Sequence, residues 1–227
     1  MKAASCSHLP EEIWESIFKF LDDNHHTFKS LSMVSKQFLS ITNRLRFSLK
    51  IKTDRAIPFL RLIFQRFPNL TSLDISICYM KIDHLAKIST FPNLPDIKSL
   101  SLTDYGYDIS EDGLRVLSKK MKKLTFLNCT NVKYMDKNHL FLIADCFPLL
   151  EELILTESVF RSPLFTRKDD FEDQLLELPK LRKIHLYDNK VMDHQSIIDL
   201  CKNCDLLQEV KVIDYLPYWK RVSYRFQ

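Results

Sequence analysis

A ten-residue pattern recurs six times along this chain of 227 residues, beginning at residue 67. Each copy holds three apolar residues in the arrangement apolar–x–x–apolar–x–apolar, and the first members of successive triplets are 27, 27, 26, 31 and 26 residues apart. A unit of this length cannot bury its own apolar face, so such units become stable only by stacking on their neighbours. The pattern therefore predicts a repeat fold. The triplets are Leu70/Leu73/Ile75, Ile97/Leu100/Leu102, Leu124/Leu127/Cys129, Leu150/Leu153/Leu155, Leu181/Ile184/Leu186 and Leu207/Val210/Val212.

The spacing within and between the triplets predicts one strand and one helix in each unit. The last two apolar residues of a triplet stand two positions apart, so both lie on one face of a short strand. Between triplets the spacing is helical: Leu114, Leu117 and Met121 follow one another at i, i+3 and i+7, with Ser110 as the expected N-cap. We therefore expect an α/β fold, a short solenoid with parallel strands inside and helices outside.

This pattern resembles the leucine-rich repeat over residues 57–215. Cys78 and Asn189 occupy the position at which that repeat carries asparagine or cysteine, and other residues replace them in the remaining units. After Val212 no further helical pattern follows. Either the aromatic residues near the chain end cover the last unit, or the array is cut short there.

Residues 8–51 lack the repeat and show three short helical segments instead. Leu9 and Pro10 begin the first, because proline is favoured in a first turn and the two acids that follow suit the helix dipole. A polar connector at 22–26 ends this segment, and Thr27 is the expected cap of the second helix. Three short helices in about 40 residues are at the lower limit of independent folding, so we expect a partner or a docked neighbour to add burial. The apolar positions at helical spacing are Ile13, Ile17, Phe20 and Leu21, then Phe28 and Leu31, then Val34, Phe38, Ile41 and Leu45.

The run from Leu9 to Thr42 resembles the F-box, the helical module that joins F-box proteins to Skp-family adaptors. The resemblance rests on the Leu-Pro start, on the apolar stripe that follows it and on the segment from Leu31 to Phe38. It implies that the Leu-Pro start and the apolar residues of the middle segment pack on the adaptor. The implied adaptor-binding residues are Leu9, Pro10, Ile13, Ile17, Phe18, Leu31, Val34 and Phe38.

Taken together, the two resemblances indicate a plant-type F-box/leucine-rich-repeat protein, with an F-box domain at residues 1–50 and about six repeats at 51–227. They imply a non-catalytic subunit of an SCF-type E3 ubiquitin ligase. Its F-box would bind a Skp-family adaptor, and through it the cullin–RING ligase, while the repeats would bind an unknown target protein. Ubiquitination would then follow from the raised effective concentration of the target. The alternative is a non-catalytic leucine-rich-repeat scaffold that is not assembled into a ligase.

The outward positions of the predicted strands offer a surface for the target. In parallel strands in register, these positions align in rows with a spacing of about 4.8 Å. Small hydroxyl residues dominate the early units, and larger or charged residues gather in the later ones. We interpret Phe126, Ile154, His185 and Tyr187 as part of a protein-recognition surface. A generic solvated strand face is the competing interpretation.

Composition argues against several other classes of protein. Glycine occurs only twice, so neither of the glycine-rich phosphate-binding loops can be present. No cofactor, metal site or catalytic constellation is expected. Cys201 and Cys204 have the CxxC spacing, yet no second such pair accompanies them, so we interpret them as core residues rather than as a metal or redox site.

Charge and hydropathy indicate neither nucleic acid nor a membrane as a partner. The formal net charge is +4, and both signs alternate along most of the chain. The densest basic stretch, at 44–61, is interleaved with apolar residues and is interpreted as a solvated helix-to-strand junction. No apolar run approaches the 18 or so residues of a membrane span, and the start of the chain lacks the core of a signal peptide. We expect an intracellular protein with free thiols, in the nucleus, the cytoplasm or both.

Overall fold

The computed structural model describes residues 9–21, 25–76, 82–90, 94–103, 111–132, 137–157, 178–187, 202–213 and 221–225. Three helices form the first part of this structure: α1 (Glu11–Phe20), α2 (His25–Ser32) and α3 (Lys36–Arg44). Their shared core consists of Phe18, Phe28, Ile41 and Leu45, with Trp14, Leu31 and Phe38 packed against it. We call this part of the chain the helical module.

Two helix starts in the module differ from the prediction. The second helix begins at His25, two residues before the cap that was expected at Thr27. The third begins at Lys36 because the Ser35 side chain accepts a hydrogen bond from the Phe38 N–H at 3.1 Å and so caps it. Val34 consequently lies outside the third helix, in the turn that joins α2 to α3.

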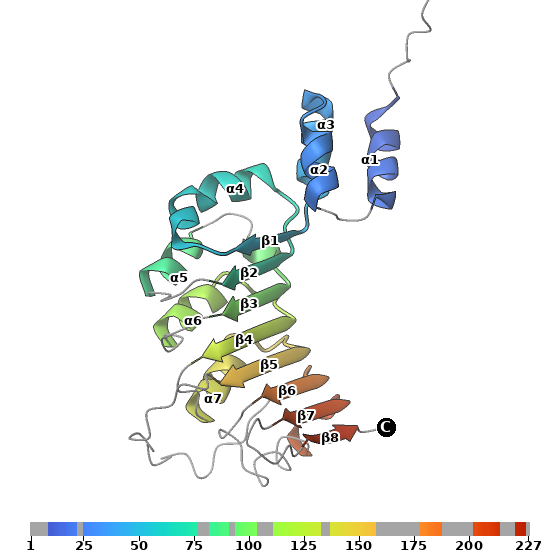
Figure 1. Ribbon diagram of the computed structural model, residues 1–227. Coiled ribbons are helices and arrows are strands. Elements are labelled where there is room, and N and C mark those ends of the chain that lie inside the picture. The colour runs from blue at the N-terminus through green and yellow to red at the C-terminus, as the bar shows by residue number, and fades with distance from the viewer. Residues whose placement is uncertain are drawn as a thin grey trace, which may run out of the picture.

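An eight-stranded sheet forms the rest of the described structure, and its strand order follows the sequence from β1 to β8. Neighbouring strands pair in parallel from β1 to β7, whereas β8 pairs antiparallel with β7. Figure 1 shows the strands stacked one above another, with the helical module at the β1 end. The strands are β1 (Ser48–Ile51), β2 (Ser72–Ser76), β3 (Ser99–Thr103), β4 (Phe126–Val132), β5 (Glu152–Glu157), β6 (Lys183–Tyr187), β7 (Glu209–Ile213) and β8 (Arg221–Arg225).

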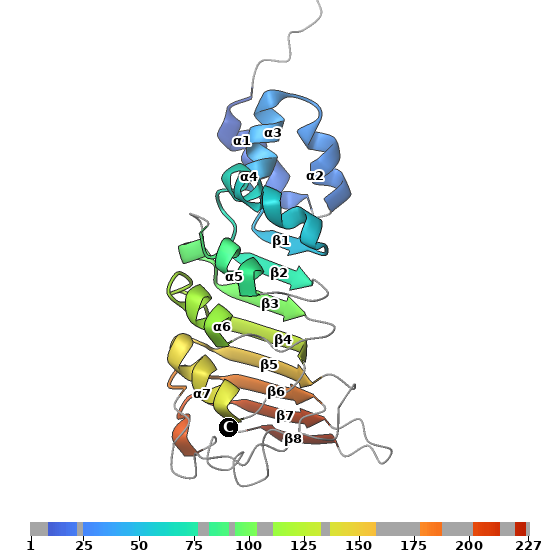
Figure 2. The ribbon, with the colours of Figure 1, turned by 90° about the vertical axis from the view of Figure 1, so that its left-hand side faces the viewer.

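Helices cover one face of this sheet, as Figures 1 and 2 show together. The sequence between consecutive strands supplies them: η1 and α4 lie between β1 and β2, α5 and η2 between β2 and β3, α6 between β3 and β4, and α7 between β4 and β5. Their bounds are η1 (Asp54–Phe59), α4 (Leu60–Arg66), α5 (Ile82–Ile88), η2 (Leu94–Asp96), α6 (Glu111–Ser118) and α7 (Lys137–Cys146). Helix α6 begins at Glu111, and its expected cap Ser110 lies outside the described residues.

The six triplets supply β2 to β7, and two strands were not predicted. Strand β1 pairs in parallel with β2, so the sheet begins before the domain boundary that was expected between residues 50 and 51. Strand β8 returns antiparallel along β7. The insertion in the longest interval and the aromatic residues near the chain end lie outside the described residues, as do Cys78 and Asn189.

A recurring hydrogen-bond pattern links each unit to the next. The Phe47 carbonyl, directly before β1, accepts hydrogen bonds from the N–H groups of Thr71 and Ser72 at 2.9 and 3.0 Å. The carbonyls of Thr71, Lys98, Thr125, Glu151 and Arg182 each accept two N–H groups of the following unit in the same way. Each shared carbonyl fixes the register of the strand that follows, so the apolar triplets of successive units align.

The triplet residues form one continuous core between the sheet and its helices. The three residues of each of the first five triplets are buried, and Leu207 and Val210 of the sixth are buried with them. Burial raises the pKa of the Cys129 thiol to about 12, so this side chain packs as a small neutral group. Cys204 is buried in the same core, as predicted, while Cys201 lies outside the described residues.

Gly113 allows helices α5 and α6 to approach closely. A Cβ atom added at this position would overlap the Leu85 Cδ1 atom and would lie 3.4 Å from the Leu85 Cβ and Cγ atoms. Leu85 is itself buried in the core. The space that a side chain would need is therefore already filled.

We expect Gly113→Val to destabilise the fold by about 1–3 kcal/mol, because the new methyl groups would press on the Leu85 side chain. Urea unfolding followed by circular dichroism measures this change. Arg115→Val, at an exposed position of the same helix, is the matched control and should change the free energy of unfolding by less than about 0.5 kcal/mol. A cost of Gly113→Val no larger than that of Arg115→Val would show that the packing between the two helices tolerates a side chain at this position.

Candidate protein-interaction surfaces

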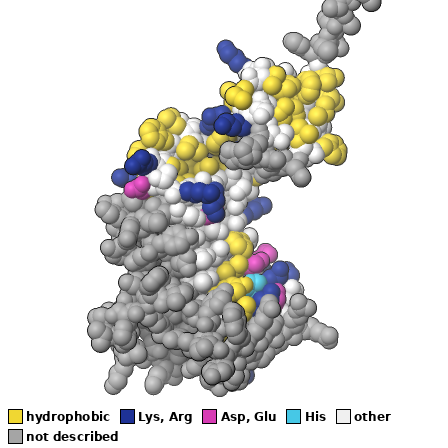
Figure 3. Space-filling model, viewed as in Figure 1, with side chains coloured by type: hydrophobic (Ala, Val, Ile, Leu, Met, Phe, Trp, Pro, Cys, Tyr) yellow, Lys and Arg dark blue, Asp and Glu magenta, His cyan; other side chains and the backbone are white. Residues whose placement is uncertain are grey.

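Helix α1 has apolar side chains on two opposite faces. Phe18 and the partly buried Trp14 point into the helical module. The opposite face presents Ile13, which is 46% exposed, and Phe20, which is 91% exposed. Both large side chains therefore face solvent, although another face of the same helix packs on the core of the module. Figure 3 shows apolar side chains gathered over this part of the molecule.

The exposed face forms a continuous stripe. Ile13, Ile17 and Phe20 follow one another four and three positions apart, a spacing that keeps them on one side of a helix with 3.6 residues per turn. The exposed Leu9 directly precedes the helix cap Pro10. An apolar surface of this kind on a soluble domain is typical of a protein interaction site. We call it the α1 stripe; its residues are Leu9, Ile13, Ile17 and Phe20.

Phe18 does not belong to the α1 stripe, which corrects its assignment as an adaptor contact. Its side chain is only 1% exposed. The ring stands edge-on to that of Phe38, with 4.9 Å between the ring centroids, and its centroid lies 6.1 Å from that of Trp14. Phe18 is thus a core residue of the helical module, and its contribution is to the shape of the module rather than to a docking surface.

The other predicted adaptor-binding residues divide into two groups. Pro10 and Val34 are exposed, and Val34 lies beside the exposed Met33 in the turn between α2 and α3. Leu31 and Phe38 are partly buried against the module core. The exposed pair Phe20 and Met33 was not among the predicted contacts. The helical spacing of Phe20 with Ile17 was the available signal for the first of these, and no sequence pattern marked Met33.

Arg44, in the last turn of α3, holds α1 in place. Its Nη2 atom donates to Glu11 Oε1 at 2.6 Å and lies 3.4 Å from Glu15 Oε2. The hydrogen bond from Lys19 lowers the pKa of Glu15, and Arg44 lowers it further. The bond to Glu11 in turn raises the pKa of Arg44. These contacts orient α1 so that its apolar stripe faces outward.

The same region joins the helical module to the sheet. The Asn69 side-chain amide donates to the Arg44 carbonyl at 2.9 Å. Arg66 at the end of α4 donates through Nε to Asn43 Oδ1 at 3.1 Å, and its guanidinium lies over the Phe67 ring. The module is therefore attached by side-chain contacts as well as by the chain that continues into β1.

We expect Glu15→Gln to lower the stability of the fold slightly at neutral pH, by about 0.5 kcal/mol, because exposed ion pairs contribute little. The folded-state pKa of Glu15 is lowered from 4.5, so the stabilisation is present above this value and is lost as the pH falls through the folded-state pKa. The difference in the free energy of unfolding between Glu15→Gln and the unchanged protein should accordingly vanish at low pH. Urea unfolding between pH 3 and 7 measures it, and Glu12→Gln, exposed on the same helix, is the matched control for the loss of one carboxylate.

The sheet face opposite the helices carries the predicted rows of outward residues. Strand pairing aligns Phe126 with Glu152 and Ile154 with His185. These pairs confirm the register expected from the triplets. Tyr187 aligns with Thr156 in the third row. Phe126, Ile154 and Tyr187 therefore stand on three successive strands, each two positions further along, and form an apolar diagonal across the face.

Charged groups border this diagonal on β6 and β7. Lys211 Nζ lies 2.7 Å from Glu209 Oε1 and lowers the pKa of Glu209. His185 Nε2 lies 3.7 Å from Glu209 Oε2, and the His185 ring stands edge-on to Tyr187 at 6.3 Å. This Nε2 atom is buried and has no hydrogen-bond partner among the residues that the structure describes, so His185 offers a binding protein the rest of its ring rather than this nitrogen. The four predicted target-binding residues thus share one face of adjacent strands.

The described part of the chain presents two surfaces, the α1 stripe and the outward face of the sheet. It contains no group of three or more His, Cys, Asp or Glu side chains that could hold a metal ion. Within it, no helix is both long and apolar enough to span a membrane. The described residues thus provide two candidate docking surfaces: the α1 stripe on the helical module and the outward face of the sheet.

Residues 6–50 match the family model of the F-box domain. The match covers the three helices of the module and most of β1. The match supports the classification of this chain as an F-box protein. F-box domains bind Skp-family adaptors in SCF complexes.

Proposed function

We propose that this chain is the substrate-recognition subunit of an SCF-type E3 ubiquitin ligase. The observation that carries the proposal is the F-box match together with the outward orientation of the α1 stripe. Burying a large apolar side chain stabilises a complex by about 1.5–3 kcal/mol. Ile13, Ile17 and Phe20 on one helix face, with Leu9 just before the helix, therefore supply the anchor that an adaptor interface needs. The turn at Met33 and Val34 adds a second exposed apolar segment.

The repeats, in this proposal, form a leucine-rich-repeat array that binds the target. Six triplets in register, the helices that follow β2, β3 and β4, and the shared-carbonyl pattern all support this assignment. The target would bind the sheet face that carries Phe126, Ile154, His185 and Tyr187, because that face holds large apolar side chains beside charged groups. The chain itself would contribute no chemistry, and it would act in the nucleus or the cytoplasm.

Affinity purification of the tagged chain from cells, with the proteasome inhibited, tests the proposal. Mass spectrometry should identify a Skp-family adaptor, a cullin and at least one further protein that accumulates. Leu9→Ala combined with Pro10→Ala should remove the adaptor and the cullin while the target stays bound. A chain that retains its target but never co-purifies with an adaptor would instead be a binding scaffold outside the ligase.

A further inference from the structure

One exposed surface of the first unit is not explained by the fold or by the proposed function. Leu60 and Phe64 of α4 point into the core, yet Phe59 and Leu62 on the outside are 60% and 63% exposed. They lie three positions apart at the start of α4, close enough to form one apolar surface.

Basic residues flank this apolar pair in the sequence. Residues 52–66 contain four basic residues and a single acidic one, Asp54. All five charged residues are exposed. Among the residues that the structure describes, Lys52, Arg55 and Arg61 form no ion pair with an acid of the chain. The positive charge is therefore available to a partner. We call Phe59, Leu62 and these three basic residues the α4 patch.

The α4 patch lies at the same end of the molecule as the α1 stripe. Helix α4 is tied to α3 through the hydrogen bond between Arg66 and Asn43, and both views place α4 beside the helical module (Figures 1 and 2). In Figure 3 apolar side chains over α4 and over α1 face the same way, with Lys or Arg side chains between them. A partner seated on the α1 stripe would therefore extend toward α4.

We propose that the α4 patch is a second contact surface for the adaptor, and that it takes an acidic segment carrying a large apolar side chain. This inference rests on the proposed function. The apolar pair would provide the anchor, and the surrounding cations would steer and orient the acidic segment. Nucleic acid fits less well, because the patch has a net charge of only +3 and a single aromatic ring for stacking.

Binding of purified full-length chain to a purified Skp-family adaptor tests the inference, measured by biolayer interferometry at about 50 and 300 mM salt. Arg55→Glu with Arg61→Glu should slow association at low salt about tenfold and remove most of its salt dependence. Phe59→Ala with Leu62→Ala should weaken the affinity about tenfold, mainly through faster dissociation. The matched controls lie at exposed positions of later units: Lys119→Glu with Lys120→Glu for the charges, and Leu149→Ala with Leu206→Ala for the apolar pair. Both should change the association rate and the affinity less than twofold. Thermal melting confirms that each variant is folded.

The outcomes separate the two proposals. Wild-type binding with unchanged affinity and salt dependence in both α4-patch variants would overturn this inference and leave the proposed function standing. Wild-type chain that fails to bind any adaptor would overturn the proposed function and this inference with it. Salt-dependent binding of a single-stranded RNA that Arg55→Glu with Arg61→Glu abolishes, without any effect on the adaptor, would assign the patch to nucleic acid instead.

Discussion

Replacing Ile13 and Ile17 by aspartate is expected to weaken adaptor binding at least 100-fold. Both side chains lie on the α1 stripe, 46% and 39% exposed, so the free protein tolerates a charge there. In the complex the same positions would be desolvated, and two unpaired carboxylates in an apolar interface would cost several kcal/mol. Isothermal titration calorimetry with purified adaptor measures the loss.

A matched control for this variant exists elsewhere in the chain. Leu149 and Leu206 are 45% and 40% exposed and lie in the turns that precede β5 and β7. Leu149→Asp with Leu206→Asp therefore introduces the same two charges at the same exposure, far from the helical module, and should leave adaptor affinity unchanged. If both pairs reduced binding equally, the effect would come from net charge, and the α1 stripe would lose its assigned role.

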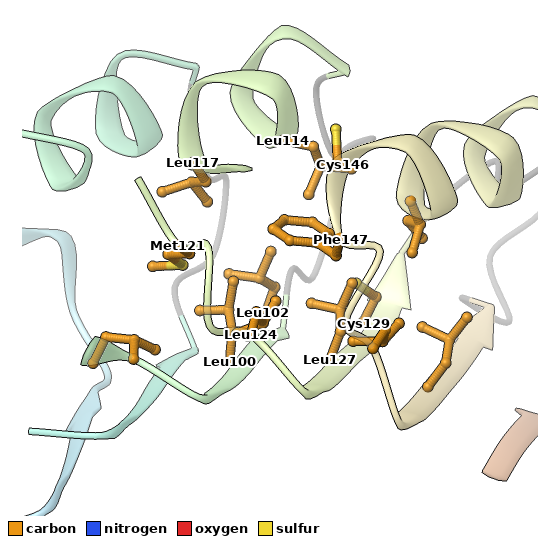
Figure 4. Close-up of a cluster of buried hydrophobic side chains, with 14 of the residues drawn as sticks. Leu100, Leu102, Leu114, Leu117, Met121, Leu124, Leu127, Cys129, Cys146 and Phe147 are labelled. Atoms are coloured by element: carbon orange, nitrogen blue, oxygen red, sulfur yellow. The ribbon is translucent and has the colours of Figure 1, made fainter. Parts of the chain in front are cut away.

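Phe147→Ala is expected to cost about 3–5 kcal/mol of the free energy of unfolding. The ring is only 2% exposed. Figure 4 shows it at the centre of the core, between Leu114 and Cys146 on the helix side and Leu102 and Leu127 on the strand side. Its backbone N–H and carbonyl hydrogen bonds persist in alanine, so the loss would report the removed ring and the cavity that it leaves.

Urea unfolding followed by circular dichroism measures the cost of Phe147→Ala. Leu149→Ala, two positions further on and exposed, should stay within about 0.5 kcal/mol of the unchanged protein. A small effect of Phe147→Ala would mean that neighbouring units collapse into the space, and that the units pack less tightly against one another than the burial of the ring indicates.

The triplet pattern contained enough information to predict six of the eight strands and their register. Apolar residues two apart mark the inner face of each strand, and a slip by one residue would turn that whole set to solvent. The pairing of Leu100 with Leu127 and of Leu153 with Ile184 follows from this alone. Strand β1 was missed because Leu49 and Ile51 lack the leading apolar residue of a triplet, and the antiparallel return of β8 has no repeat signal at all.

The candidate surfaces were only partly predictable, for a physical reason. An apolar stripe on a helix normally faces a core, but α1 has apolar residues on both sides, and spacing alone does not say which side packs inward. The structure turns Phe18 inward and Ile13 outward. Large aromatic side chains decide this, because Phe18 gains contacts with both Trp14 and Phe38. The sheet face was easier to anticipate, since alternation fixes which residues point outward.

The contacts of Arg44 have a consequence for geometry at long range. Its side chain grips α1 through Glu11, and its carbonyl accepts the Asn69 amide from the turn before β2. One residue thus braces the helix that would carry the adaptor against the first strands of the sheet that would carry the target. Two proteins bound at these places would be held at a distance and a relative orientation that the fold of this chain sets.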